Sequence, residues 1–199
     1  MPQRIGLFGG TFDPPHVGHL VTAVNVRYAL ELDLVILMVA HDPWQKQGTR
    51  SISPALDRVA MVQAAVSGVA GLIAGEDEIL RGGPSFTADT LAGLAAKYQD
   101  AELFTILGDD AASALSTWSR IDEVVARSQL VVVDRPGSPV TPPTEFTWIR
   151  VESPHLEISS TDLRARFVDG RPLDYLLTKP VLDEIYSRGL YGATKATPQ

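Results

Sequence analysis

Cysteine is absent from this chain of 199 residues. There is therefore no disulfide framework, no thiolate metal site and no thiol nucleophile. Positive charge is also scarce, because 17 Lys and Arg stand against 24 Asp and Glu, for a net charge of −7. Sequence-blind binding of nucleic acid needs a basic surface, so this balance argues against it. A nucleotide substrate is still allowed, since the local field of a site can oppose the net charge.

Long hydrophobic runs are missing as well. The longest uninterrupted apolar stretch covers residues 34–40, far short of a membrane span. The apolar part of the N-terminus is too short for a secretory signal. We therefore expect a cytoplasmic protein with no membrane partner. The length and a hydrophobic content of 45% favour one domain over residues 1–192, followed by a polar, disordered tail over 193–199.

Strand patterns alternate with helical ones along the chain. Buried strands are predicted at 4–8, 34–39, 103–107 and 130–133, with further strands at 71–80 and 147–151. The first helix shows an apolar stripe of Leu20, Val24 and Tyr28 at steps of four. Further helices are expected from Ser53-Pro54 (a capping side chain, then proline at the first helical position), Phe86, Ile158 and Thr178. This alternation predicts an α/β fold with a doubly wound parallel sheet and a small C-terminal helical part, and ligands at the carboxyl ends of the strands.

The stretch GGTFDPPHVGH, residues 9–19, joins the first predicted strand to the first helix. A glycine turn that leads into a helix N-terminus is an anion site, because backbone N–H groups and partial positive charge meet there. His16 and His19 add two side chains on one helix face. Neither GxGxxG nor GxxxxGK[ST] is present. A zinc site needs at least one more ligand, so the phosphate interpretation is favoured.

The pattern GxFDPxHxGH resembles the nucleotidyltransferase superfamily, and the chain from about residue 3 to 192 is similar to bacterial nicotinate mononucleotide adenylyltransferases. The resemblance implies a Rossmann-like nucleotidyltransferase fold and an ATP triphosphate contacted by both motif histidines. It assigns ATP contacts, through backbone or close approach, to the following residues: Gly9, Gly10, Thr11 and Phe12.

A second motif, ISSTDLR, begins at Ile158. Alone it is a capped helix start, because Ser159 and Asp162 have the spacing of a capping box. Beside the first motif, it resembles the ISSTxxR signature of the superfamily. That resemblance implies that hydroxyls, a helix N-terminus and an arginine hold the β- and γ-phosphates, and the matching residues are Ser159, Ser160, Thr161 and Arg164.

A third motif, Gly108-Asp109-Asp110, follows a buried strand. A turn with a helix cap is the plain interpretation. The resemblance assigns Gly108 and Asp110 to the ATP ribose, with Asp109 open as an alternative.

The residues for the mononucleotide rest on shorter segments. RGGPSFTADTL resembles the segment whose threonine, here Thr87, caps a helix and presents N–H groups to the nicotinate carboxylate. Trp118 matches the aromatic residue that stacks on the pyridine ring, although a core or surface tryptophan is an equal alternative. Lys46 is expected to bind the mononucleotide phosphate, with Trp44 beside it; a solvated loop lysine is the alternative.

The expected reaction is transfer of the adenylyl group of ATP to nicotinate mononucleotide, with Mg²⁺ carried by the ATP phosphates and no metal held by the protein. The alternatives are an adenylyltransferase for nicotinamide mononucleotide or phosphopantetheine, or a nucleotide-binding module without turnover. His16 and the TADTL and TW segments favour the nicotinate enzyme. The resemblance allows for a homo-oligomer. One departure is the loop after residue 39, which begins Ala40-His41-Asp42-Pro43 where many relatives have an early proline.

Overall fold

The computed structural model describes residues 2–42, 52–134, 140–154 and 156–193. The strands in it are β1 (Arg4–Gly10), β2 (Leu34–Val39), β3 (Leu72–Gly75), β4 (Glu102–Leu107), β5 (Gln129–Asp134) and β6 (Trp148–Glu152). The α-helices are α1 (Val17–Ala29), α2 (Ala55–Val66), α3 (Asp77–Arg81), α4 (Thr87–Lys97), α5 (Asp109–Ser113), α6 (Ile121–Arg127), α7 (Ser160–Asp169) and α8 (Lys179–Arg188). Short 3-10 turns, η2 (Leu115–Thr117) and η3 (Leu190–Gly192), complete the described elements.

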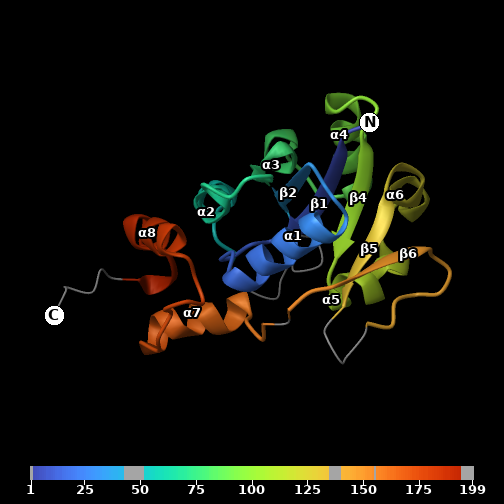
Figure 1. Ribbon diagram of the computed structural model, residues 1–199. Coiled ribbons are helices and arrows are strands. Elements are labelled where there is room, and N and C mark those ends of the chain that lie inside the picture. The colour runs from blue at the N-terminus through green and yellow to red at the C-terminus, as the bar shows by residue number, and fades with distance from the viewer. Residues whose placement is uncertain (1, 43–51, 135–139, 155, 194–199) are drawn as a thin grey trace.

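The strands form one parallel sheet in the order β3-β2-β1-β4-β5-β6 (Figure 1). This is a doubly wound sheet, as the alternation of patterns predicts. From β1 the chain continues to β2 and β3 on one side of β1. It then crosses back and adds β4, β5 and β6 on the other side of β1. The crevice above this reversal, at the carboxyl ends of β1 and β4, is where ligands bind in such sheets.

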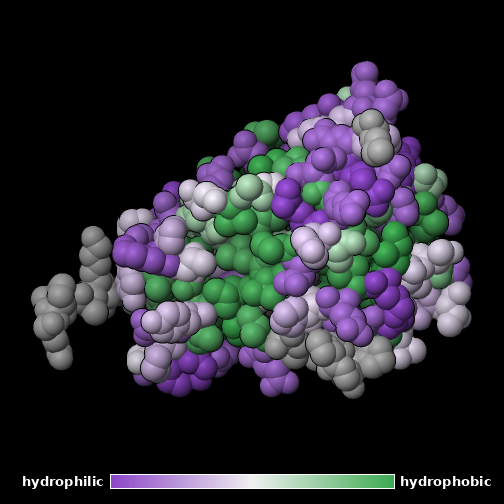
Figure 2. All heavy atoms as spheres, in the orientation of Figure 1, coloured by the Kyte–Doolittle hydropathy of each residue, from purple (hydrophilic) through white to green (hydrophobic). Residues whose placement is uncertain are grey.

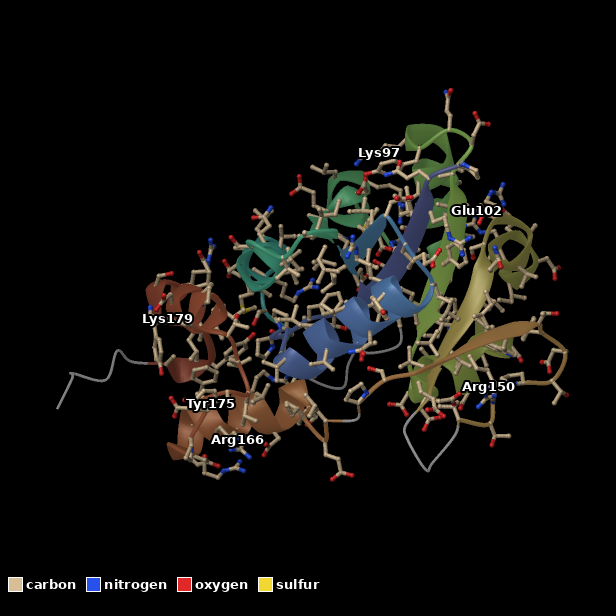
Figure 3. All side chains as sticks on the ribbon, in the orientation of Figure 1. Lys97, Glu102, Arg150, Arg166, Tyr175 and Lys179 are labelled. Atoms are coloured by element: carbon tan, nitrogen blue, oxygen red, sulfur yellow. The ribbon has the colours of Figure 1, made fainter. Side chains whose placement is uncertain are left out.

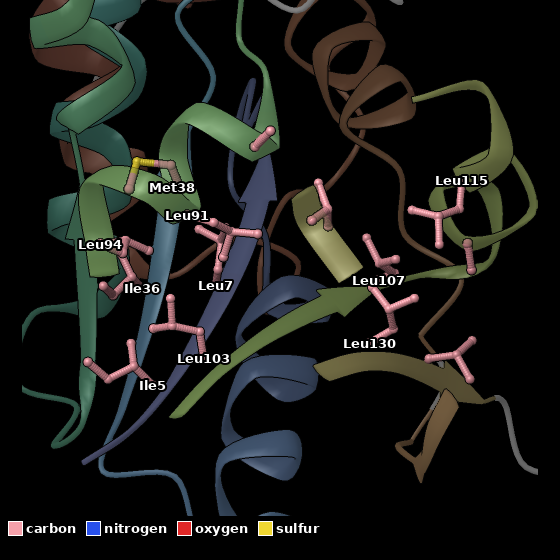
Figure 4. Packing of buried hydrophobic residues seen from close by; sticks show 14 of the residues in the cluster. Ile5, Leu7, Ile36, Met38, Leu91, Leu94, Leu103, Leu107, Leu115 and Leu130 are labelled. Atoms are coloured by element: carbon pink, nitrogen blue, oxygen red, sulfur yellow. The ribbon is translucent and has the colours of Figure 1, made fainter. Parts of the chain in front are cut away.

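Each face of the sheet carries its own hydrophobic core, because successive strand residues point to opposite faces. On one face, Leu91 and Leu94 of α4 pack on Leu7 and Ile36 (Figure 4). On the other face, Ala23 and Val26 of α1 and Val59, Val62 and Val66 of α2 pack on β2, β4 and β5. The result is a three-layer arrangement of helices, sheet and helices.

A third cluster joins the C-terminal helices to the rest of the chain. Leu163 of α7 and Val181 and Ile185 of α8 are buried against Met61 and Ala65 of α2. In Figure 1, α8 lies next to α2, and α7 lies below α8 and α1, away from the sheet. The predicted tail over 193–199 falls, except for its first residue, outside the described residues, and the single domain over 1–192 stays a prediction.

The structure corrects three expectations. The stripe on α1 is wrong, because Val24 and Tyr28 are 45% and 86% exposed while the small Ala23 and Val26 face the sheet. The predicted strand over 71–80 is only β3, and the rest of it forms the short helix α3. Helix α2 begins one residue later than expected, so that Pro54 is its N-cap residue and Ser53 lies before it. The helix α6 has no counterpart among the expected elements.

The surface of the described residues is mixed. Figure 2 shows an apolar area across the middle of one face, bordered by polar residues. Charged side chains lie around the molecule, and Lys97 and Glu102 mark the amino-terminal end of β4 (Figure 3). No helix among the described residues has the length and apolar content needed to cross a membrane.

Candidate active site

Two cavities meet above the carboxyl ends of β1 and β4. The first, here called the α4 cavity, has a volume of about 330 Å³ and includes Leu7, Gly9, Met38, Glu78, Ser85, Thr87 and Trp118 in its lining. The second, the α1 cavity, has a volume of about 340 Å³ and is lined among others by His16, Gly18, His19, Asp134, Ser153 and Ile158. The same four residues line both cavities, and they therefore form a common wall: Phe8, Gly108, Asp110 and Ala111.

Two glycines leave open space at this site. A Cβ atom added to Gly9 or to Gly108 would meet no other atom within 4 Å. Both residues line a cavity, so a ligand can approach their backbone closely. Gly10 is glycine for another reason, because a Cβ there would lie 2.8 Å from the ring of Phe12.

His16 and His19 lie together at the start of α1. The backbone N–H of His16 donates to Nδ1 of His19 over 3.1 Å, and the ring centroids are 3.7 Å apart. Gly18 makes room for this arrangement, because a Cβ there would lie 3.0 Å from Nδ1 of His16. The sequence prediction that both histidines share one face is confirmed.

His16 is buried, and desolvation lowers the pKa of its ring to about 4. At neutral pH the ring is therefore uncharged. The ring of His16 faces the first turn of α1, where the side chains of His16 and His19 together form a capping box.

Phe12 lies beneath His19 and lines neither cavity. Its ring centroid is 5.0 Å from that of His19 and 6.0 Å from that of Phe8, in edge-to-face contacts. Only 3% of Phe12 is exposed, and its φ of 48° is in the left-handed region. Burial of the ring compensates the backbone strain of a bulky residue at this φ angle. The buried ring packs against the ring of His19 and helps to hold it in place.

The second motif contacts the first directly. Ser160 Oγ donates to the carbonyl of Pro14 over 2.9 Å, and Arg164 Nη1 donates to the carbonyl of Asp13 over 2.6 Å. Arg164 Nη2 also donates to Thr161 Oγ1 over 3.1 Å. Ser159 caps α7 by accepting from the N–H of Asp162, as the capping box spacing predicts. Residues 159–164 line neither cavity, but the preceding Ile158 lines the α1 cavity.

Arg58 also holds the first motif in place, although the sequence analysis did not identify it. Its side chain is 1% exposed and donates to four carbonyls, at 2.6 to 3.2 Å: those of Thr11, Ala40, His41 and Ser53. The guanidinium thereby joins the loop after β1 to the loop after β2. Nothing in the sequence pattern of an amphipathic helix signals such a role.

Asp13 is held from the C-terminal side of the chain. Its Oδ1 accepts from the hydroxyl of Tyr191 over 2.6 Å, and its Oδ2 accepts from the N–H of Ser53 over 3.4 Å. Burial and the Asp13 carboxylate together raise the pKa of the Tyr191 hydroxyl well above its usual value, so that it stays protonated and donates. Sequence reasoning gave no signal for this contact.

Comparison with known proteins places the chain in a family. It matches the family model for cytidylyltransferase-like proteins over residues 7–166. It is 40% identical to a "Probable nicotinate-nucleotide adenylyltransferase" of Acidothermus cellulolyticus, with 96% of this chain and 95% of that protein covered. A protein of the same name from Halalkalibacterium halodurans is 38% identical, with 95% of this chain and 91% of that protein covered. The chain belongs to the nicotinate-nucleotide adenylyltransferase family.

The fold agrees with that family. The nicotinic acid mononucleotide adenylyltransferase of Plasmodium falciparum, solved in complex with NaAD, superposes with a TM-score of 0.77 at 15% identity, over 98% of this chain and 100% of that one. At this identity the likeness concerns the fold alone. The fold class expected from the sequence is confirmed.

In this nicotinate-nucleotide adenylyltransferase family member, the α4 cavity brings together several of the residues assigned to ligands. Thr87 is the first residue of α4, and Trp118 follows η2. The indole Nε1 of Trp118 is buried and has no partner among the described residues. The adenylyltransferase residues expected to bind the mononucleotide phosphate, Lys46 and Trp44, lie outside the described residues.

The departure from the family pattern, His41-Asp42, pairs with the segment before α4. His41 Nδ1 donates to the carbonyl of Gly83 over 3.0 Å, and its backbone N–H donates to Ser85 Oγ over 2.9 Å. Asp42 forms a parallel bridge with Pro84. The loop after β2 is thus tied to the rim of the α4 cavity, which Ser85 lines.

Proposed function

We propose that this chain transfers the adenylyl group of ATP to nicotinate mononucleotide, with pyrophosphate as the second product. The observation that carries the proposal is the common wall between the two cavities, formed by Phe8, Gly108, Asp110 and Ala111. Joining two nucleotides requires that one phosphate lies in line with another across a short gap. Two cavities of similar volume that meet at a strand end supply that arrangement.

The reaction needs alignment and charge neutralisation rather than a base. A phosphate oxygen of the mononucleotide, already anionic at neutral pH, forms a bond to the α-phosphorus of ATP. The bond from that phosphorus to the oxygen bridging to the β-phosphorus breaks, and pyrophosphate leaves with the electron pair. The work of the protein is to hold both phosphates in line and to stabilise charge on the leaving group.

The α1 cavity is the proposed ATP side. Its polar lining includes His16 and His19 at the N-terminus of α1, where the helix dipole favours an anion. Because Nδ1 of His19 accepts from the backbone, the neutral ring carries its proton on Nε2 and presents a donor there. We assign phosphate contacts to His19 and, as its neutral neighbour, to His16. Gly108 and Asp110, which line both cavities, bind the ribose, and Gly9, Gly10 and Thr11 add backbone contacts from the lining of the adjoining α4 cavity.

Arg164 and the hydroxyls of the second motif are proposed to hold the outer phosphates. Arg164 approaches the first motif through the carbonyl of Asp13, and α7 begins at Ser160 beside it. The guanidinium is a cation in contact with the first motif, and it suits the charge that develops on pyrophosphate. Ser159 and Thr161 keep the first turn of α7 in position.

Mg²⁺ enters this proposal as part of the substrate, bound to the ATP phosphates, where it neutralises charge. Among the described residues, no group of three His, Cys, Asp or Glu side chains could hold a metal ion. No step is assigned to the ion here. Both cavities are lined by one copy of the chain, so the proposal does not depend on a homo-oligomer. We also propose that the reaction takes place in the cytoplasm.

The α4 cavity is the proposed mononucleotide side. Thr87 begins α4, an 11-residue helix whose first N–H groups suit a carboxylate. Trp118 provides an aromatic surface in the same cavity. This pairing favours a mononucleotide with an acidic aromatic ring.

The experiment measures pyrophosphate release with ATP and Mg²⁺, with nicotinate mononucleotide, nicotinamide mononucleotide and phosphopantetheine offered in parallel. We expect strong turnover with the first and little with the others. A preference for the amide would overturn the assignment of the carboxylate to α4. No release with any of the three would leave a nucleotide-binding module as the function.

A further inference from the structure

Glu78 is a buried carboxylate in the wall of the α4 cavity. It lies on α3, is 7% exposed, and lines the same cavity as Thr87 and Trp118. The hydroxyl of Thr90 donates to its Oε1 over 2.6 Å and fixes the orientation of the group. In the described part of the chain, no Lys, Arg or His forms an ion pair with Glu78. A carboxylate buried without a cation is costly, and such groups mark places where a ligand supplies the missing charge.

The N-terminus of α4 supplies the opposite charge in the same cavity. Thr87 is its first residue, and the N–H groups of the first helical turn carry partial positive charge. Thr90, which holds Glu78, is the fourth residue of the same helix, and its hydroxyl also lies 3.3 Å from the carbonyl of Phe86. The lining of the α4 cavity therefore combines partial positive charge at Thr87 with a negative group at Glu78. Its floor is apolar, because Leu7 and Met38 continue into it from the core (Figure 4).

A nicotinate ring attached to ribose has the matching charge pattern. It carries a carboxylate at ring position 3 and a quaternary, positively charged nitrogen at ring position 1, with one ring carbon between these positions. In a cavity with an apolar floor these charges interact more strongly than in water. If the ring carboxylate lies at Thr87, its repulsion from the carboxylate of Glu78 turns it away from that residue. The positively charged ring nitrogen then lies on the side of the ring that faces Glu78.

We propose that Glu78 is a specificity-determining residue whose carboxylate faces the positively charged ring nitrogen of the mononucleotide, while the N-terminus of α4 binds the ring carboxylate. This proposal rests on the proposed function. The cavity thereby selects a ring that carries both charges. Thr90 is the positioning residue that keeps Glu78 in place, through its 2.6 Å hydrogen bond.

The first test compares the parent with Glu78→Gln, which keeps an acceptor for Thr90 and removes the charge. We expect KM for nicotinate mononucleotide to rise about tenfold, as loss of a charged contact does. KM for ATP is expected to stay unchanged, because Glu78 does not line the α1 cavity. The matched control is Asp77→Asn, the neighbouring carboxylate, which pairs with Lys97 over 3.6 Å and lines neither cavity. An unchanged KM for the mononucleotide in Glu78→Gln overturns the proposal.

The second test isolates the ring charge. Nicotinamide mononucleotide and its dihydro form, whose ring is neutral, are compared as competitors of nicotinate mononucleotide. The parent is expected to bind the cationic ring more tightly, and Glu78→Gln to lose that preference while binding of the neutral ring stays the same. Equal weakening of both competitors would assign Glu78 to a ribose hydroxyl and overturn the contact with the ring nitrogen.

The two proposals fail in distinguishable ways. If the parent releases no pyrophosphate with any mononucleotide, the proposed function fails. If the parent turns over and Glu78→Gln has parental constants, only the role of Glu78 fails. Far-UV circular dichroism and the thermal midpoint of the variant exclude a misfolded protein as the cause of a raised KM. As a second variant, Thr90→Val removes the donor that holds Glu78 and is expected to raise the same KM.

Discussion

The backbone N–H of His16 donates to Nδ1 of His19 over 3.1 Å, and this hydrogen bond orients the ring of His19. The ring centroids of His16 and His19 are 3.7 Å apart, and the ring centroid of Phe12 lies 5.0 Å from that of His19. A neutral His19 ring held in this way keeps its remaining proton on Nε2. The spacing of three residues between the histidines is therefore a requirement of geometry.

Substitution His19→Ala is expected to lower turnover about 100- to 1000-fold, as removal of one donor aimed at a developing charge does. Binding of the mononucleotide should change little, because His19 lines only the α1 cavity. Pyrophosphate release measures the first effect and calorimetric titration the second. Val24→Ala, on an exposed position of the same helix, serves as the control. Parental turnover in His19→Ala would remove the phosphate role of this residue.

The stability of the protein is expected to fall as the pH decreases from about 6.5 to about 4, in part because of His16. The pKa of its ring is about 4 in the folded protein and near 6.5 in the unfolded chain. In this window the unfolded state binds a proton that the native state does not, so protonation favours unfolding. The contribution is on the order of 3 kcal/mol and is fully present above pH 6.5. Thermal midpoints of the parent and of His16→Gln should converge on acidification.

Gly9→Ala is expected to lower kcat/KM roughly 10- to 100-fold, because a methyl group in the cavity displaces the reacting phosphates. The fold should tolerate it, since a Cβ at Gly9 meets no atom within 4 Å. The control is Gly93→Ala in α4, which also has open space and should gain about 0.5–1 kcal/mol of stability with unchanged activity. Steady-state kinetics and urea unfolding of both variants measure these effects. Parental kinetics in Gly9→Ala would mean that no ligand approaches this residue.

Arg58→Met is expected to destabilise the protein by roughly 3 kcal/mol or more, because several buried carbonyls lose their donor. Equilibrium urea unfolding measures the change. Arg58→Lys should recover only part of the stability, since one ammonium cannot reach four carbonyls. Arg81→Met, on an exposed position of α3, provides the comparison for loss of a positive charge alone. A loss no larger than in Arg81→Met would contradict the role of Arg58 as a link between the two loops.

The strands and the first motif could be predicted from the sequence because their signals are local. β2 is a continuous apolar run, β4 is apolar after Glu102 except for Thr105, and the motif of residues 9–19 is one uninterrupted stretch. Arg58 and Glu78 could not be predicted in this way. Each is a charged residue in an ordinary helical segment, and its role depends on partners brought near by the fold.

The burial pattern of α1 was wrong for a related reason. Steps of four from Leu20 marked Val24 and Tyr28. Ala23 and Val26, three residues apart on a neighbouring face of the helix, are the residues buried against the sheet. Which face of a helix is covered depends on the layer that it packs on, and a single helix does not encode this.

The hydrogen bond between Tyr191 and Asp13 spans 178 positions of the sequence. Ser160 and Arg164 reach the same loop from 146 and 151 positions away. During synthesis, the ribosome therefore makes the loop after β1 among its first residues and supplies these contacts only much later. Until residues 160 to 191 have left the ribosome, the nascent chain can form β1 and β2, but the loop lacks the full set of these contacts. Closure of such long-range contacts is slow, so enzymatic competence should appear as a late event of folding.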